Sequence, residues 1–424
     1  MSVNRRNFIR SSAAGLVGSF LYNSQIAAGT NTYLPRFDML SVAGEEEWWR
    51  VVKSQFPLED KLLYFNNGSL GPSPDYVINN TELFRRMLDA FPSKYMWGGW
   101  SADKERVRSL IAGYFSADSE EIAVTHNTTE GMNLFARSFD LKEGDEIILA
   151  DHEHPTGVSP YEYFCRPLGI KLVRPVLPLL PESPEEITDV YRRAITGRTR
   201  LISMVHMTNT NGMILPVKQV SELAHNNNII VCVDGAQSAG MFRVDLPELG
   251  CDFYAASGHK WLFGPKGTGI LFARKEKRHL LKPLMVSSNW NRSDIRMFED
   301  YNTRNLPEYL GLGSAIEFNN LLMQDRKQER IYALKRYFRG FIEDDRRFRF
   351  VTPASDLLSA GIQVVEIEGK SAVDAGKFLT DRYSIDCRPM STNGLNALRI
   401  SLSVFNTMED IDILVKGLRE FAAL

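Results

Sequence analysis

The chain has 424 residues, of which 44% are hydrophobic and 24% are charged, so it is long enough to bury the core of a globular enzyme with two or three structural units. Its formal net charge is -2 and its pI is about 6.4. Without a basic excess the protein has little charge to neutralise a phosphate backbone, and this argues against nucleic acid as a partner.

Four cysteines lie far apart in the sequence, with no Cys-x-x-Cys pair among them, so neither a zinc site nor a disulfide framework is predicted. We expect no bound metal. Cys232 lies inside the apolar run 229–233, and that position predicts a core residue rather than a reactive thiol.

Residues 1–30 resemble a twin-arginine export signal: the pair Arg5-Arg6 precedes a weakly apolar stretch, 13–21, and then small residues. The stretch is too short and too rich in Ser and Gly to be a membrane-spanning helix, and a disordered basic N-terminus is the alternative. The resemblance implies a periplasmic or otherwise exported protein, with the twin-arginine translocase as a transient partner. That pathway carries folded proteins, including those that already hold a cofactor.

From about residue 121 the chain alternates short apolar runs with segments of helical length. This alternation predicts crossover helices and a mostly parallel central sheet flanked by helices, which is an α/β fold. One intervening helix is marked by Pro216 in its first turn and by a polar end at 226–228. The apolar runs are 122–124, 146–150, 172–173, 201–205 and 229–233.

After about residue 301 the pattern changes to long helical stretches such as 314–344, followed by strands at 361–367 and 398–402. This change predicts a smaller C-terminal α+β domain. Thr407 and Asp410 have the spacing of a capping box, and apolar residues follow on one face, so the last helix should be packed against the rest of the protein.

Lys260 lies in a short polar turn between apolar runs, a setting that withdraws its amine from water and lowers its pKa. A neutral amine can form an imine, and Ser257 and His259 beside it could donate hydrogen bonds to a phosphate. A surface lysine on a turn is the alternative. The glycines that follow lack the order of a nucleotide-binding loop, so nucleotide binding is not predicted.

Asp234 directly follows an apolar strand, so its carboxylate should lie at the carboxyl end of a parallel strand, where open α/β sheets bind ligands. A buried carboxylate facing a pyridine nitrogen keeps that nitrogen protonated, and the protonated ring can stabilise a carbanion. Helix capping is the alternative, but Lys260 follows about 26 residues later and favours the cofactor role.

Thr128 and Thr129 lie where a predicted strand ends and a helix begins. Hydroxyls and free backbone amides at a helix N-terminus form a seat for phosphate. Helix capping explains one of these threonines more easily than it explains both.

The motif Ser257-Gly258-His259-Lys260, together with the segment 233–237, resembles the class V aminotransferases, the group of cysteine desulfurases and isopenicillin N epimerase. The resemblance runs from about Tyr64 to the C-terminus. It implies pyridoxal phosphate as the cofactor and the aspartate aminotransferase type of fold, with a large domain at 63–300, a small domain at 301–424 and a segment at 31–62 that joins the small domain. It also implies a homodimer with active sites that include residues of both subunits.

The resemblance also implies roles for single residues. Lys260 would hold the cofactor as a Schiff base, Asp234 would pair with the ring nitrogen, and His154 would stack on the ring as a catalytic residue, although a lone histidine in a polar turn is more often only solvated. The other cofactor contacts would be Gln237 and Asn209 at the ring hydroxyl, and Thr128, Thr129, Ser257 and His259 at the phosphate.

Arg399 matches the arginine that binds the substrate carboxylate in this family, and Arg388 is a second candidate anion contact. The residues support this role independently, because an arginine inside an otherwise apolar strand, 398–402, is costly unless it is paired.

Two features of the sequence distinguish between the subgroups of this family. Cysteine desulfurases carry a nucleophilic cysteine between the counterparts of Arg388 and Arg399, but the interval 389–398 has none, and Cys387 is a poor substitute. The segment 65–72 is similar to the Asn-His-Gly-Ser-x-Gly opening of isopenicillin N epimerase-like proteins, with Asn67 in place of histidine, although a Gly-rich turn could serve the fold alone.

The predicted function is therefore a pyridoxal-phosphate enzyme that acts at Cα of an amino acid or amino-acid-like substrate, in an isopenicillin N epimerase-like subgroup. Aminotransferase and C–S lyase activities are the alternatives within the family. A non-catalytic binding protein is the alternative outside it, and the presence of Lys260, Asp234 and Arg399 argues against that reading.

Exchanging Arg5 and Arg6 together for lysine should leave folded protein inside the cytoplasm, because the export signal depends on the arginine pair. Cell fractionation and immunoblotting measure the distribution, with Arg10→Lys as the matched control. Unchanged export of the double variant would refute the twin-arginine interpretation.

Overall fold

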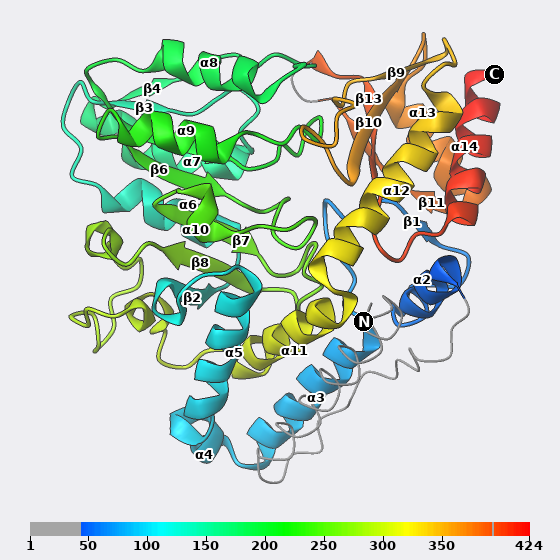
Figure 1. Cartoon of the computed structure of the whole chain (residues 1–424). Helices are drawn as coiled ribbons and strands as arrows, with labels where there is room; N and C mark the ends of the chain where they lie inside the picture. The colour runs from blue at the N-terminus through cyan, green and yellow to red at the C-terminus, as the bar shows by residue number, and fades with distance from the viewer. Residues whose placement is uncertain (1–43, 392–393) are drawn as a thin grey trace, which may run out of the picture. The chain divides into compact units, whose positions relative to one another are not determined.

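The computed structural model describes residues 44–391 and 394–424, which belong to one compact unit of the chain (Figure 1). The predicted export signal lies outside the described residues. Within the described part, no helix is both long enough and apolar enough to cross a membrane.

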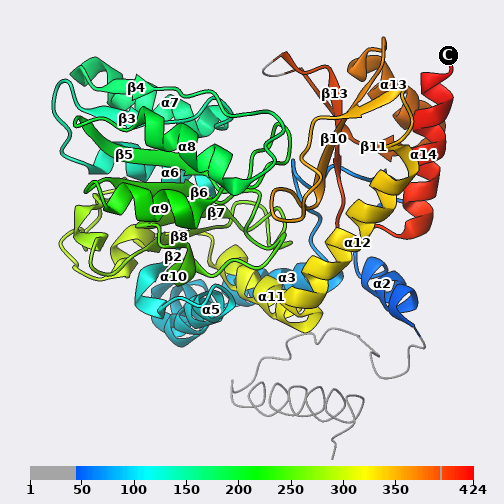
Figure 2. The ribbon, with the colours of Figure 1, turned by 45° about the horizontal axis from the view of Figure 1, so that its top comes forward.

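Seven strands of the described residues form a mostly parallel sheet in the order β2-β8-β7-β6-β5-β3-β4 (Figure 2). All five runs predicted as strands lie in this sheet. Strand β8 is the exception to the parallel arrangement, because it runs antiparallel to both β2 and β7. The strands are β2 (Ile122–Thr125), β3 (Glu146–Ile148), β4 (Lys171–Val173), β5 (Thr199–Val205), β6 (Ile230–Asp234), β7 (Phe253–Ser257) and β8 (Gly269–Ala273).

Helices cover both faces of this sheet, as Figure 2 shows. Val231 and Val233 of β6 pack toward one set of helices, and Cys232 between them packs toward the other. Because both faces are buried, the strands are continuously apolar, and Cys232 is confirmed as a core residue. One face is covered by α5 (Ser101–Tyr114), α8 (Pro184–Ala194) and α9 (Val217–His225), and the other by α6 (Thr128–Ser138) and α7 (Pro155–Phe164).

The predicted helical stretch 314–344 is two helices, α11 (Leu306–Leu322) and α12 (Gln324–Ile342). The break is at Met323, whose φ of 57° lies in the left-handed region and ends the regular hydrogen bonding of α11. Helix α11 packs against α3 (Asp75–Ala90) and α5, so it contributes to the core of the large sheet. The predicted domain boundary near residue 300 stays a prediction.

The C-terminal part of the chain contains a second, antiparallel sheet in the order β12-β13-β10-β9. Across it, Arg388 of β12 faces Arg399 of β13. The predicted capping box is confirmed, because the backbone N–H of Asp410 donates to Oγ1 of Thr407 (3.2 Å) and that of Thr407 donates to Oδ2 of Asp410 (2.9 Å). The strands are β9 (Phe348–Phe350), β10 (Ile362–Ile367), β12 (Arg388–Met390) and β13 (Ala397–Ser401), and α12, α13 (Ala372–Tyr383) and α14 (Met408–Ala422) pack on this part.

The N-terminal end of the described chain is tied to this C-terminal part. Strand β1 (Leu63–Tyr64) pairs in parallel with β11 (Ile385–Asp386), and Lys53 in α2 (Glu45–Lys53) forms an ion pair with Asp410 (2.7 Å). The backbone N–H of Ser401 donates to the carbonyl of Phe65 (2.7 Å). These contacts bring the segment 65–72 to the ends of the central strands. The remaining short α-helices of the described residues are α4 (Pro92–Lys94) and α10 (Leu246–Leu249).

Candidate active site

A cavity of about 200 Å³ lies at the carboxyl ends of β2, β5, β6 and β7. This edge is where open α/β sheets bind ligands. Nine of the residues predicted from the sequence line the cavity, whereas Arg388 and Arg399 do not. The nine are Thr128, Thr129, His154, Asn209, Asp234, Gln237, Ser257, His259 and Lys260.

Lys260 is placed in the cavity by the turn that follows β7, and burial lowers the pKa of its amine to about 8. The carboxylate of Asp234 opposes this shift, and the guanidinium groups of Arg399 and Arg388 add to it. A lysine in solution has a pKa near 10.4, so a much larger share of Lys260 is neutral at physiological pH. A neutral amine is the form that reacts with a carbonyl.

Asp234 ends β6 with its side chain only 5% exposed, and burial raises the pKa of its carboxyl group. The N–H of Ala236 donates to Oδ1 at 2.9 Å, and Lys260 and His154 also favour the charged form. No ion pair to Asp234 occurs among the described residues. A protonated ring nitrogen would supply the missing cationic partner.

His154 is the N-cap residue of α7. Its Nδ1 accepts the backbone N–H of Thr156 (3.2 Å) and lies 2.7 Å from the Thr156 hydroxyl, so Nδ1 is unprotonated. Burial lowers the pKa of the imidazole and therefore favours the neutral ring as well. A neutral, half-buried ring at the cavity wall is suited to stacking on an aromatic ligand.

The first turn of α6 and the end of β7 meet at one end of the cavity. The backbone N–H of Thr128 donates to Oγ of Ser257 (3.1 Å), and the two hydroxyl oxygens are 2.9 Å apart. Asn127 caps the helix by accepting the N–H of Glu130 (2.9 Å), so neither threonine serves as the cap. The hydroxyls of Thr128 and Thr129 therefore lie at a helix N-terminus without capping it, which is an arrangement that binds phosphate.

His259 lies beside these hydroxyls on the lining of the same cavity. Burial lowers the pKa of its imidazole to about 4, and its buried Nδ1 has no hydrogen-bond partner in the part of the chain that the structure describes. A buried ring nitrogen without a partner is costly, and a ligand oxygen or hydroxyl in the cavity would satisfy it.

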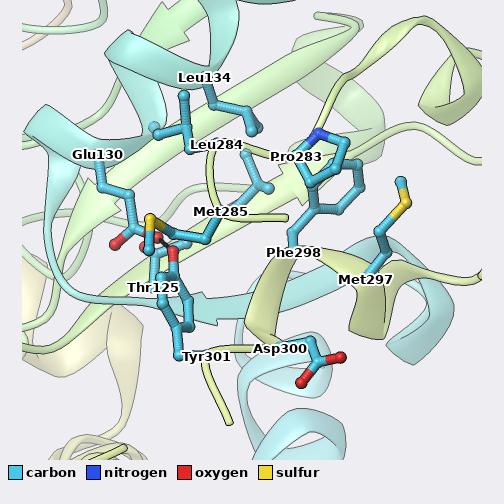
Figure 3. Close-up of a pocket in the computed structure, with 12 residues that line it drawn as sticks. Thr125, Glu130, Leu134, Pro283, Leu284, Met285, Met297, Phe298, Asp300 and Tyr301 are labelled. Atoms are coloured by element: carbon cyan, nitrogen blue, oxygen red, sulfur yellow. Dashed lines mark hydrogen bonds between the residues drawn. The ribbon is translucent and has the colours of Figure 1, made fainter. Parts of the chain in front are cut away.

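The carboxylate of Glu130, which the sequence analysis missed, stabilises the first turn of α6. Glu130 accepts the backbone N–H of His126 (2.7 Å), its Oε2 is 2.8 Å from Nδ1 of His126, and the Tyr301 hydroxyl also donates to its carboxylate. Figure 3 shows Glu130 and Tyr301 at a neighbouring pocket of about 10 Å³. That volume has room for at most about one water molecule, so the pocket is not a candidate substrate site.

Gln237 and Asn209 line the cavity from the loops that follow β6 and β5. The Gln237 amide is held at both ends, because its Nε2 donates to the carbonyl of Gly68 (2.8 Å) and its Oε1 accepts the indole N–H of Trp261 (2.9 Å). The side-chain oxygen of Asn209 is buried and has no partner among the described residues. Asn209 can therefore accept a hydrogen bond from a ligand without breaking an existing one.

Arg399 lies beyond the cavity lining, with 1% of its surface exposed. Its Nη2 donates to Oγ of Ser69 (2.7 Å) and more weakly to Oδ1 of Asn66 (3.3 Å), and its Nη1 donates to the carbonyl of Asn209 (3.2 Å). Within the described ranges it has no carboxylate partner. Burial, together with Arg388, lowers the pKa of the Arg399 guanidinium to about 10. A buried guanidinium surrounded by neutral acceptors is ready to bind an anion.

Arg388 is exposed and also donates to Oγ of Ser69, at 3.3 Å. One neutral hydroxyl thus receives hydrogen bonds from two arginines. The carboxylate of a substrate in place of this hydroxyl would relieve the repulsion between the two guanidinium groups.

The segment 66–72 belongs to the site, although the sequence left open whether it serves only the fold. A Cβ added to Gly71 would lie 2.0 Å from the carbonyl oxygen of Lys260, so only glycine permits this approach. The N–H of Gly71 donates to the carbonyl of His259 (2.9 Å). The Gly-Ser-x-Gly pattern in the sequence was the signal for this close contact.

Cys387 lies between β11 and β12 and is 6% exposed. Burial raises the pKa of its thiol to about 12, and Asp386 adds to the shift. A thiol with this pKa is protonated at physiological pH and is a poor nucleophile. The structure therefore supports the expectation that Cys387 does not replace a loop cysteine.

The residues fit the pyridoxal phosphate predicted from the sequence. The cavity offers an amine, a buried carboxylate that has no cationic partner among the described residues, and a helix N-terminus that carries hydroxyl groups. The side-chain atoms of Asn209 and His259 that lack a partner in the described chain belong to residues of the same lining. Each of these matches one part of the cofactor: its aldehyde, ring nitrogen, phosphate and ring hydroxyl.

Comparison with known proteins agrees with this geometry. A family model described as aminotransferase class-V matches residues 73–414. Isopenicillin N epimerase from Amycolatopsis lactamdurans is 31% identical over 393 residues, covering 88% of this chain and 98% of that protein. A cysteine desulfurase from Klebsiella pneumoniae is 30% identical over 407 residues, covering 88% and 98%. The solved structure of cysteine desulfurase CsdA from Escherichia coli has a TM-score of 0.77 and 25% identity, covering 90% and 99%, and confirms the predicted fold class.

Attachment of pyridoxal phosphate to the cofactor-free protein should accelerate as the pH rises through about 8, because the reaction needs the neutral amine of Lys260. Stopped-flow absorbance at a series of pH values measures the midpoint. Asp234→Asn should move the midpoint to lower pH, since Asp234 raises the pKa of Lys260. A midpoint near 10.4, the value for a solvated lysine, would contradict the buried position.

Arg399→Ala should weaken amino-acid binding by roughly 10- to 100-fold, because a charge-assisted bond contributes about 1.5–3 kcal/mol, while cofactor binding should change little. Spectral titration of the cofactor-loaded protein with amino acids measures the affinity. Arg339→Ala removes another buried arginine, one that bonds to Gln363 instead, and serves as the control. Equal affinities in the two variants would remove Arg399 from the substrate site.

Proposed function

The chain belongs to the aminotransferase class V family, and on that premise we propose that it is an enzyme that removes the Cα proton of an amino acid bound to pyridoxal phosphate. Family membership confirms the predicted enzyme and cofactor. The observation that carries the proposal is that Lys260 and Asp234 line one cavity, and that Arg399 lies just beyond it with no counter-ion among the described residues.

In this proposal the substrate carboxylate is bound by Arg399, with Arg388 as a second anion contact. The carboxylate takes the place of the Ser69 hydroxyl on the guanidinium groups, so that binding costs the protein no existing ion pair. An amino acid held at its carboxylate has its amino group and Cα directed toward the cavity that contains Lys260. Arg399 thus orients the substrate.

The amine of Lys260 becomes free when the amino group of the substrate replaces it on the cofactor. With its lowered pKa it would then accept the Cα proton, while the electron pair of the broken C–H bond stays on carbon. When bound, pyridoxal phosphate supplies the conjugated ring that delocalises this pair. Asp234 would favour a protonated ring nitrogen, and His154, the N-cap residue of α7, would stack on the ring. Lys260 can return the proton to the same face of Cα or pass it to another atom, whereas inversion requires that a second donor or water protonate the opposite face. This choice distinguishes the reactions of the family.

Among these reactions, epimerisation of an amino acid is the best-supported specific activity. The curated relatives include epimerases and cysteine desulfurases at similar identity, 31% and 30%, so identity alone does not separate them. Two features do: the interval 389–398 contains no cysteine, and the Cys387 thiol is buried with a pKa of about 12. Transamination and cysteine-independent C–S cleavage are the alternatives.

We further propose that the protein is exported by the twin-arginine pathway and works as a homodimer. The Arg5-Arg6 pair supports export. A dimer is supported by Trp97 and Trp290, which expose 61% and 60% of their surfaces on segments that line one common cavity. Sedimentation equilibrium of the purified protein distinguishes dimer from monomer.

Incubation with amino acids in heavy water should introduce deuterium at Cα of the substrate, because every reaction of the proposal begins by breaking this C–H bond. NMR and chiral chromatography measure exchange and inversion. Lys260→Ala should abolish exchange, whereas Lys266→Ala, which removes an exposed lysine nearby, should not.

The products separate the alternatives within the family. Exchange with inversion supports an epimerase, accumulation of the pyridoxamine form supports an aminotransferase, and release of sulfide or pyruvate supports a lyase. A cofactor-loaded protein that exchanges no amino acid at Cα would refute the proposal and favour a binding protein.

A further inference from the structure

A second buried lysine, Lys327, lies behind the turn that carries Lys260. It is on α12, just after the break at Met323, and it is 1% exposed. In the described part of the chain it has no carboxylate partner. An amine in such a position loses its hydration and is kept only where other groups accept its hydrogens.

The acceptors of Lys327 belong to the turn or to its support. Nζ donates to the carbonyl of Trp261 and to Oδ1 of Asn319, both at 2.6 Å, and it lies 4.3 Å from the centre of the Phe263 ring. Asn319 in turn donates from Nδ2 to the carbonyl of Leu262 (2.7 Å). Two successive carbonyls after Lys260 are therefore fixed by one buried pair of side chains.

The backbone of this turn needs such support. Phe263 has a φ of 61°, in the left-handed region that bulky residues avoid, and the N–H of Gly264 closes the turn on the carbonyl of Gly258 (2.8 Å). If the carbonyls of Trp261 and Leu262 were free to rotate, the turn could relax, and the direction of the Lys260 side chain would change with it.

The side chain of Trp261 is a second connection between Lys327 and the cavity. The indole N–H of Trp261 donates to Oε1 of Gln237 (2.9 Å), and Gln237 lines the cavity and donates to the carbonyl of Gly68 (2.8 Å). The backbone of Trp261 is fixed by Lys327, and its side chain fixes Gln237.

We infer that Lys327 is a positioning residue, which sets the orientation of Lys260 and Gln237 toward the cofactor through the backbone of Trp261. The inference rests on the proposed attachment of the cofactor to Lys260. It assigns a functional consequence to a side chain that touches neither the cavity nor the substrate.

Helix α12 offers a matched control two turns further on. Lys335 is also 1% exposed, and its Nζ donates to the carbonyls of Ser355 and Ser359 (both 3.1 Å) and to Oδ1 of Asp356 (2.9 Å). Burial lowers the pKa of both amines. Lys327→Met and Lys335→Met therefore both remove a buried amine from the same helix, but only the first removes support from the Lys260 turn.

The experiment compares the cofactor-loaded wild type with Lys327→Met, Lys327→Gln and Lys335→Met. Circular dichroism in the cofactor absorbance band reports the orientation of the ring, titration of the cofactor-free proteins gives the cofactor Kd, and melting reports stability. We expect Lys327→Met to reduce the cofactor dichroism and weaken cofactor binding at least about ten-fold, with partial recovery in Lys327→Gln, which keeps one donor. Lys335→Met should lower the melting temperature without changing either cofactor readout.

Equal cofactor spectra and affinities in Lys327→Met and Lys335→Met would overturn the inference and make Lys327 a core residue like any other. Should Lys327→Met not fold, Lys327→Gln decides the same comparison. Borohydride reduction and peptide mapping of the wild type test the role of Lys327 separately from the proposed function. If the cofactor is not attached to Lys260, the proposed function and the role of Lys327 are both refuted. If it is attached to Lys260 but the Lys327 variants bind and orient the cofactor as the wild type does, only the role of Lys327 is refuted.

Discussion

The burial of Lys260 between a carboxylate and two guanidinium groups is the constraint on which the rest of the site depends. The amine can be desolvated because Asp234 partly compensates it, and Asp234 can be buried because Lys260 and His154 favour its charged form. Neither charge is fully neutralised within the described protein. The cavity is therefore organised around charged groups that a bound cofactor and substrate would neutralise.

The groups that hold the buried guanidinium of Arg399 in place are neutral. Ser69, Asn66 and the carbonyl of Asn209 receive the hydrogens of Arg399, and glycine at position 71 lets the N-terminal segment pass directly over the Lys260 carbonyl. Neutral acceptors hold an arginine in place without neutralising it. The site is thus rigid and remains able to bind an anion.

The sequence predicted the mostly parallel sheet and the final capped helix, because apolar periodicity and capping spacing are local signals. It also predicted nine residues of the cavity, partly from their local setting and partly from the family resemblance that the Lys260 motif supports. It did not predict the break at Met323 or the antiparallel direction of β8, since both depend on packing between distant segments. Trp261 and Lys327 were missed as site residues for the same reason, and the bonds of Asn66 and Ser69 to Arg399 were not predicted although the segment 65–72 was singled out. Their roles arise from contacts across 24 to more than 300 residues, which no local pattern reports.

The parallel pairing of β1 with β11 has a consequence for how the protein folds. Leu63 pairs with Ile385, so the segment that brings Ser69 and Gly71 to the site has no partner strand until almost the whole chain has been synthesised. Contacts of such long sequence separation form late. The β1–β11 pair and Arg399 on β13 are therefore completed only with the last strands, so the contacts that would bind a substrate carboxylate are among the last that the chain can form.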